Sequence, residues 1–300
     1  MRVFVTGATG FIGSAVVTQL GQRGHEVLGL ARSDTSAAAL RSLGVDVHRG
    51  NLEDLDSLQA GARLADAVVH TAFNHDFSQY VQNTVADGRV VEAIAQALEG
   101  SGKPFVAASA TTVRSDGQHV TETDTANPSE VPRMHSEAAL AWADRGLRPS
   151  VVRLPPTVHG PGDAAFVPTL IELARKTGVA AYIGAGENRW PAVHRLDAAG
   201  LFVLALEHAE PGARLHAVAE QGIPMRHIAQ VIAQGLGVPT KSLDPEDAQA
   251  HFGWLTMFAG LDAPALSTST RAQTGWTPEH DGLLEDMRQH YFQDSCQASE

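Results

Sequence analysis

The sequence predicts an α/β fold in which a parallel sheet of about seven strands is covered by helices on both faces, a doubly wound arrangement. Three observations predict it. Short β-branched and apolar runs recur along the chain, stretches with helical periodicity separate them, and the first run ends in a glycine-rich turn. The chain has 300 residues, 43% of them hydrophobic, which is enough for one large or two closely packed domains.

The first unit of the chain combines a strand, a glycine turn and a helix. Arg2 to Thr6 is an apolar run, Gly7, Gly10 and Gly13 follow in a G-x-x-G-x-x-G spacing, and Phe11 to Arg23 has helical periodicity. One glycine makes a tight turn, the next lets a pyrophosphate approach the backbone, and the third lets the helix pack closely on the strand. Free N–H groups at the start of the helix face the anion. The residues expected to bind a dinucleotide here are Gly7, Thr9, Gly10, Phe11, Ile12 and Gly13.

The residues after the second strand, His25 to Leu30, indicate which dinucleotide is bound. A site that prefers NAD usually has Asp or Glu here to bind the ribose hydroxyls, but the sequence has Ala31, Arg32 and Ser33. The missing acid removes repulsion toward a 2′-phosphate, and the Arg32 guanidinium suits phosphate oxygens. The sequence therefore favours NADP(H), with Arg32 and Ser33 in the site. The alternative is that Arg32 is one more solvated charge.

The later elements continue the alternation up to about residue 160. We expect further strands at Val45–His48, Asp66–Thr71, Phe105–Ser109, Ser150–Leu154, Ala180–Ile183 and Leu215–Val218. We expect helices at Ser36–Leu43, Asp54–Leu64, Ser78–Leu98, Pro132–Arg145, Phe166–Lys176, Asp197–Glu207, Pro224–Leu236 and Leu283–Tyr291. This order predicts a dinucleotide-binding domain over residues 1–160, with a returning segment near 190–210, and a smaller substrate-binding α/β region over residues 161–300.

Several residues follow strand ends, which is where ligands bind in such sheets. Asn51 and Leu52 are expected at the adenine pocket, and Ala72 and Phe73 along the cofactor. Pro155 opens a rigid segment, ending at Asp163, that is expected to wall the nicotinamide pocket.

Polar residues at two strand ends are candidates for contact with substrate. His75 and Asp76 could touch it or form a solvated loop pair. The hydroxyl cluster from Ser109 to Thr112 could meet a carbonyl or simply cap the strand. The polar loop Arg114 to Glu130 is long enough to be functional.

Composition excludes several classes of function. The net charge of −12 disfavours nucleic-acid binding. The single cysteine, Cys296, allows no disulfide framework, and no histidine pattern has metal-ligand spacing, so we expect no metal. No apolar run approaches the roughly 20 residues that span a bilayer. We also expect no secretory leader, since the first residues form a core strand, and hence a cytoplasmic protein.

Four stretches, taken in order, resemble the extended short-chain dehydrogenase/reductase superfamily, which includes sugar-nucleotide epimerases and dihydroflavonol reductases. They are Thr6–Gly13, Ser109, Arg153–Pro161 and Pro191–Asp197. The resemblance covers nearly the whole chain. It implies a Rossmann domain of about seven strands and a smaller C-terminal substrate domain.

The superfamily's catalytic pair, Tyr-x-x-x-Lys, is replaced in this chain. Arg133 stands at the tyrosine position and Glu137 at the lysine position, as in atypical epimerase/dehydratase-like and 3β-hydroxysteroid-dehydrogenase-like proteins with Arg-x-x-Ser-Glu. Arginine stays protonated at neutral pH, so we expect Arg133 to polarise a carbonyl or stabilise an alkoxide, held by Glu137. The resemblance places Ser109 on the substrate oxygen.

A proton must then come from another group. His135, His159 and His194 are candidates because imidazole titrates near neutral pH, although each could equally be structural.

These residues support three hypotheses. The first is an NADPH-dependent reductase of small aldehydes or ketones. The second is a redox sensor that binds the cofactor without turnover, as the loss of Tyr and Lys would suggest. The third is an epimerase or dehydratase of a nucleotide-linked sugar. The expected partner is a small carbonyl substrate, and the helices Ser78–Leu98 and Pro132–Arg145 are candidates for a homodimer contact.

Overall fold

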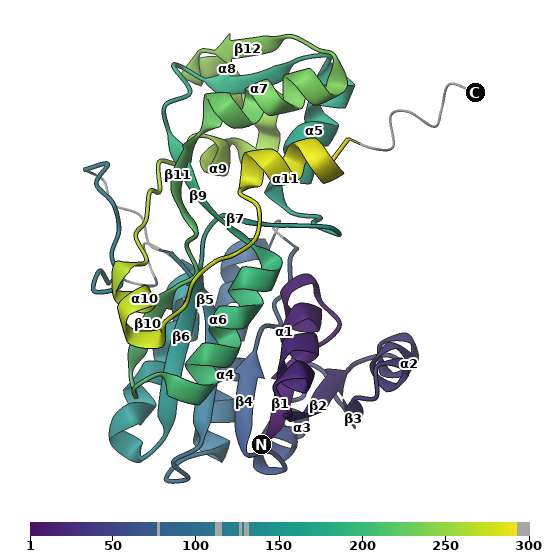
Figure 1. Cartoon of the computed structure of the whole chain (residues 1–300), viewed down its shortest axis with the longest axis vertical. Helices are drawn as coiled ribbons and strands as arrows, with labels where there is room; N and C mark the ends of the chain where they lie inside the picture. Colours follow the sequence, from purple (N-terminus) through teal and green to yellow (C-terminus); the bar gives the residue numbers. More distant parts are fainter. Residues whose placement is uncertain (77–78, 112–115, 126–127, 129–131, 293–300) are drawn as a thin grey trace.

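The structure is a computed structural model that describes residues 1–76, 79–111, 116–125, 128 and 132–292. Its larger part, at the bottom of Figure 1, is built on a seven-stranded parallel sheet in the order β10-β6-β5-β4-β1-β2-β3. The strands are β1 (Arg2–Thr6), β2 (Glu26–Ala31), β3 (Asp46–Arg49), β4 (Ala67–His70), β5 (Pro104–Ala110), β6 (Arg148–Leu154) and β10 (Ala213–His216). The predicted doubly wound fold is confirmed.

Helices cover both faces of this sheet. One face carries α1 (Phe11–Gln22), α2 (Asp34–Ser42) and α6 (Arg195–His208), and the other carries α3 (Leu55–Arg63), α4 (Tyr80–Ala97) and the 3₁₀ helix η2 (Pro132–Arg145). Successive strands lie to one side of β1 up to β3, and the chain then crosses to the other side at β4. The carboxyl ends of β1 and β4 therefore form the switch point, where ligands bind in such sheets.

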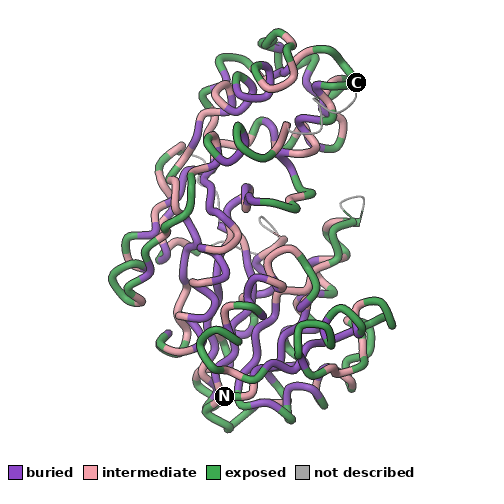
Figure 2. Tube along the Cα trace, turned by 45° about the vertical axis from the view of Figure 1, so that its right-hand side comes forward, coloured by how far each residue is buried: buried purple, intermediate pink, exposed green. Residues whose placement is uncertain are grey.

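The smaller part lies at the top of Figure 1 and has its own apolar core around the fully buried Trp190. Its three-stranded sheet has the order β11-β9-β7, and β12 pairs with β8. These strands are β7 (Thr157–His159), β8 (Ala180–Ile183), β9 (Arg189–His194), β11 (Glu220–Pro224) and β12 (Thr240–Leu243). The helices are α5 (Phe166–Thr177), α7 (Met225–Leu236), α8 (Pro245–Phe252), η3 (Gly253–Leu255), α9 (Thr256–Ala259) and α11 (Leu283–His290). Helix α10 (Thr268–Thr274) lies against β10 and α6 of the larger part (Figure 1). Buried backbone runs through the cores of both parts (Figure 2).

The sequence predicted the long periodic elements and missed short ones. Strands β7, β9, β11 and β12 were not predicted, because they are short or carry proline and charged residues that obscure alternation. The segment Pro132–Arg145 is helical as expected, but its turns are 3₁₀. Thr112, Cys296 and parts of the loop Arg114–Glu130 lie outside the described residues.

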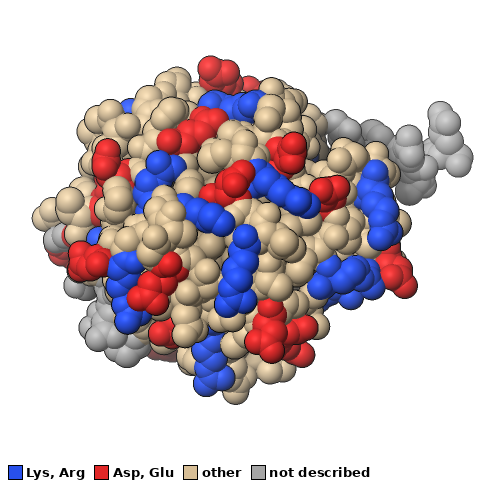
Figure 3. Space-filling view, turned by 90° about the horizontal axis from the view of Figure 1, so that it is seen from below, with Lys and Arg blue, Asp and Glu red and all other residues tan. Residues whose placement is uncertain are grey.

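The surface and the helices bear on what the chain can associate with. On the face viewed from below, acidic and basic side chains are interspersed (Figure 3). Within the described part of the chain, no helix combines the length and apolar character needed to cross a bilayer. In the same part, no group of three or more His, Cys, Asp or Glu side chains is arranged to hold a metal ion.

Candidate functional site

The turn between β1 and α1 has the shape that the glycine spacing predicts. Gly7 has φ +70°, and a Cβ there would lie 2.7 Å from the backbone nitrogen of Ala72. A Cβ on Gly13 would lie 2.0 Å from the carbonyl oxygen of Gly7, so only glycine lets α1 pack this close to the turn. Gly10 is the N-cap of α1 and is exposed, and no side chain caps the helix. The uncapped helix start can therefore receive a pyrophosphate, and the turn fits a dinucleotide.

The other predicted cofactor residues lie in this turn or after the carboxyl ends of β3, β4 and β6. Ala72 and Phe73 follow β4, next to the end of β1. The Asn51 side-chain oxygen accepts hydrogen bonds from the N–H groups of Glu53 and Asp54, which start α3, and Leu52 packs against the core. Thr9, Phe11 and Ile12 lie in the turn and the first turn of α1, while Pro155 is buried directly after β6.

Two arginines stand at the ends of β2 and β3. Arg32 is exposed directly after β2, and the Ser33 side chain accepts a hydrogen bond from the Ser36 N–H at the start of α2. Arg49, which was not predicted, donates to the Ser33 carbonyl at 2.6 Å and to the Asp34 carboxylate at 2.9 Å. Both cations therefore belong to the segment expected to meet the adenosine ribose.

Arg133, at the tyrosine position, is held between a carboxylate and an aromatic ring. Its Nη1 donates to the Asp87 carboxylate on α4. Its guanidinium carbon lies 4.2 Å from the centre of the Phe73 ring, a cation–π contact. The side chain is 11% exposed. A positive charge therefore stands beside the strand end where the cofactor is expected.

Asp87 belongs to a buried chain of polar contacts. Its second oxygen lies 3.0 Å from Nε2 of His70, and Nδ1 of that imidazole lies 2.6 Å from the Thr6 hydroxyl. Burial alone would raise the pKa of Asp87, but the Arg133 charge and the His70 hydrogen bond outweigh it and hold the pKa below its usual range. Asp87 therefore remains a carboxylate and a counter-charge for Arg133.

Two ring-bearing residues near Arg133 respond to its charge. Burial first, and then the Arg133 charge, lower the pKa of His75. Burial raises the pKa of Tyr80 against the opposing effect of Arg133. Phe73 makes edge-to-face contacts with both, at centroid separations of 5.3 Å and 6.4 Å. The Arg133 cation is thus bordered by the rings of Phe73, His75 and Tyr80.

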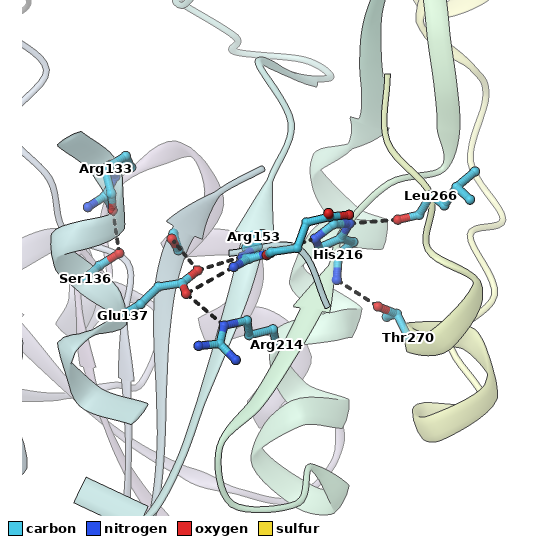
Figure 4. Close-up of polar contacts among 10 residues, drawn as sticks. Arg133, Ser136, Glu137, Arg153, Arg214, His216, Leu266 and Thr270 are labelled. Atoms are coloured by element: carbon cyan, nitrogen blue, oxygen red, sulfur yellow. Dashed lines mark hydrogen bonds and ion pairs between the residues drawn. The ribbon is translucent and has the colours of Figure 1, made fainter. Parts of the chain in front are cut away.

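Glu137, at the lysine position, is fully engaged with two other arginines. Its carboxylate accepts from Nε and Nη2 of Arg153 at 2.6 and 3.1 Å and from Nε of Arg214 at 3.0 Å (Figure 4). The Ser109 hydroxyl donates to it at 3.4 Å. The expected pairing of Glu137 with Arg133 is therefore wrong. Arg153 has no solvent exposure, so this carboxylate neutralises a buried charge.

The 3₁₀ geometry of η2 explains why the two residues point in different directions. In an α-helix, residues four apart are offset by about 40° around the axis, whereas in a 3₁₀ helix of three residues per turn the offset is about 120°. Arg133 therefore faces Asp87 on α4, while Glu137 faces β6 and β10.

His216, the last residue of β10, links the Glu137 network to Leu266, just before α10. Nη1 of Arg153 lies 3.3 Å from Nε2 of His216, whose Nδ1 lies 2.7 Å from the Leu266 carbonyl oxygen. Burial lowers the pKa of His216 to about 4, and the Arg153 charge adds to the effect against the Leu266 hydrogen bond.

The three histidines proposed as proton donors occupy different surroundings. His135 packs against α4. A Cβ added to Gly88 on that helix would lie 3.0 Å from the Cβ of His135. Nδ1 of His159 lies 2.7 Å from Asp286, and the His194 ring stacks on His280 at 4.6 Å. His159 and His194 thus contact residues near the C-terminal end of the described chain, Asp286 and His280.

Sequence reasoning missed Thr6, His70, Asp87 and Arg49. The signal for Asp87 was present, because it lies three, four and seven residues before Val90, Val91 and Ile94, on the buried face of α4. A carboxylate on such a face requires a buried partner.

Comparison with known proteins identifies the family. The sequence model of the NAD dependent epimerase/dehydratase family matches residues 3–218, and the chain belongs to this family. Family members are oxidoreductases and epimerases that bind NAD(P), and the glycine turn described above fits such a cofactor. An uncharacterised protein of Schizosaccharomyces pombe is 50% identical over 96% of this chain and 98% of its own length.

A more distant relative and a solved structure are also similar to this chain. A 2-alkyl-3-oxoalkanoate reductase of Stenotrophomonas maltophilia is 28% identical over 80% of this chain and 77% of its own length. The structure of a dTDP-glucose 4,6-dehydratase from Streptomyces venezuelae with NAD bound superimposes with a TM-score of 0.77 at 19% identity, covering 99% of this chain and 98% of that one. These structural similarities show the fold.

Proposed function

We propose that the chain is an NADPH-dependent reductase that converts small aldehydes or ketones to alcohols. The observation that carries the proposal is the position of Arg133, a cation held against Phe73 at the carboxyl end of β4, beside the glycine turn. A fixed positive charge stabilises the negative charge that develops on a carbonyl oxygen during hydride addition. The relatives described as reductases support the same class of reaction.

The chain's residues would hold and polarise the carbonyl. NADPH, when bound, supplies the hydride that adds to the carbonyl carbon. Arg133 and Ser109 bind the carbonyl oxygen and stabilise the alkoxide, which then takes a proton from a histidine or from water. The contact of the Ser109 hydroxyl with Glu137 is long, at 3.4 Å, so redirecting this hydroxyl toward a substrate sacrifices little.

The preference for NADPH would rest on the two arginines at the ends of β2 and β3. Arg32 is exposed where the 2′-phosphate is expected, and Arg49 lies next to Ser33. Guanidinium groups bind phosphate oxygens through paired hydrogen bonds.

The test is a titration of the purified protein with NADPH and NADH, followed by absorbance of the reduced nicotinamide after adding a panel of aldehydes and ketones. The proposal expects tighter binding of NADPH and bleaching that depends on a carbonyl compound. Tight binding without bleaching across the panel would contradict it.

That second outcome would favour a redox sensor that binds the cofactor without turnover. The absence of a Tyr-x-x-x-Lys sequence anywhere in the chain favours this candidate. It also counts against an epimerase or dehydratase, since those reactions in this family use the missing tyrosine.

A further inference from the structure

The polar chain behind Arg133 links it to the strand that leads into the glycine turn. Thr6 is the last residue of β1, His70 the last of β4, and Asp87 lies on α4. All three are buried, with at most 4% of any of them exposed. The contacts run without a break from the Thr6 hydroxyl through both nitrogens of His70 to both oxygens of Asp87, and then to Arg133.

The direction of these hydrogen bonds follows from the donors available. An ionised Asp87 can only accept, so Nε2 of His70 donates to it, and Nδ1 of the same ring pairs with the Thr6 hydroxyl, which can act as donor or acceptor. Every side-chain polar atom of Thr6, His70 and Asp87 then has a partner. A buried polar chain of this kind is rigid, because any other arrangement leaves a buried group unpaired.

Arg133 needs such a support. An arginine side chain has a long, flexible stem, and a charge stabilises a transition state only if it is already in place. Phe73 fixes the plane of the guanidinium, while Asp87 fixes its position within that plane.

We propose that Asp87 and His70 are positioning residues, which hold the Arg133 guanidinium at a fixed place relative to the ends of β1 and β4 for its work on the substrate oxygen. This inference rests on the proposed reductase function. It adds that the lost tyrosine is replaced by an assembly and not by arginine alone. The assembly is Arg133, Asp87, His70 and Thr6, and only its first member meets the substrate.

A double-mutant cycle on turnover tests this inference. Asp87→Asn is made in the wild-type protein and in Arg133→Gln, with Glu92→Gln, an exposed position on the same helix, as the matched control. For each protein, kcat and KM for an aldehyde and the Kd for NADPH are measured. Circular dichroism and thermal unfolding show whether each variant is folded.

Asp87→Asn is expected to lower kcat about 100-fold in the wild type, the scale of a misplaced catalytic group. In the Arg133→Gln background the same change should cost less than about threefold, because its target is gone. The NADPH Kd and the Glu92→Gln control should stay close to wild type. His70→Gln, which keeps a donor toward Asp87, should cost less than Asp87→Asn.

Equal losses of kcat from Asp87→Asn in both backgrounds would overturn the inference, as would a loss confined to NADPH binding. If Asp87→Asn does not fold, His70→Gln in both backgrounds supplies the same cycle. Failure of the reductase proposal has a different signature. In that case the wild type turns over no carbonyl compound, or Arg133→Gln is as active as the wild type.

Discussion

Two positions of the same helix, four residues apart, differ in what surrounds them. Arg133 donates to the Asp87 carboxylate, and its guanidinium lies against an aromatic ring next to the glycine turn. Glu137 has three charged contacts to two arginines, one of them fully buried, and joins η2 to β6 and β10. The superfamily resemblance places these two positions at its Tyr-x-x-x-Lys pair.

The two positions therefore differ in their partners and in the elements that they contact. Arg133, at the tyrosine position, lies against Phe73, which follows the end of β4. Glu137, at the lysine position, belongs to an ion-pair network that joins η2 to β6 and β10. Glu137 was expected to form the ion pair with Arg133, but Asp87 forms it instead.

The largest expected effect is on stability, at Glu137. Glu137→Gln leaves the buried Arg153 without its counter-charge and should lower the free energy of unfolding by about 3–5 kcal/mol, the usual cost of breaking a buried ion pair. Urea denaturation measures it, with Asp144→Asn, an exposed position on η2, as the control. A loss no larger than that of the control would contradict the structural role given to Glu137.

The second effect is on the pH dependence of stability. The folded-state pKa of His216 is about 4, below its ordinary value of 6.5, so between these values the unfolded chain binds a proton that the folded protein does not. Stability should therefore be complete above pH 6.5 and fall as the pH drops toward 4, by at most about 1.4 kcal/mol per pH unit for this group.

His194 shifts in the same direction, to a pKa of about 4, because of burial and the neighbouring His280. Urea midpoints between pH 4 and 7 for the wild type and His216→Gln separate the two contributions. The variant should show a shallower slope, and an unchanged slope would mean that His216 is not protonated on unfolding.

The smallest effect concerns the cofactor and lies away from both positions of η2. Arg32→Ala should weaken NADPH binding by about 1–3 kcal/mol, the scale of charge-assisted hydrogen bonds, and leave NADH binding nearly unchanged. Parallel titrations with the two cofactors measure this. Equal losses for both would show that Arg32 does not read the 2′-phosphate.

The sequence was sufficient for the sheet and for the cofactor turn, because both depend on local patterns. The run Arg2–Thr6 and the three glycines each act within a few residues, and the structure gives each glycine a steric reason. Strands β9 and β11 were missed because their alternation is broken by Pro191 and Gly222.

The candidate site was harder to predict because its contacts join distant parts of the chain. Asp87 and Arg133 are 46 residues apart, and Thr6 and His70 are 64 residues apart. Arg133 and Glu137 were expected to pair, and their spacing would place them on one face of an α-helix, but the 3₁₀ turns of η2 separate them.

The most direct test of the account is the rate of hydride transfer from bound NADPH in a single turnover, followed by stopped-flow absorbance at saturating aldehyde, for the wild type and Arg133→Gln. If Arg133 stabilises the developing alkoxide, the variant should bind NADPH as the wild type does and react about 100- to 1000-fold more slowly, the cost of losing one such donor. An unchanged rate with bound cofactor would show that Arg133 takes no part in the reaction and would contradict the account.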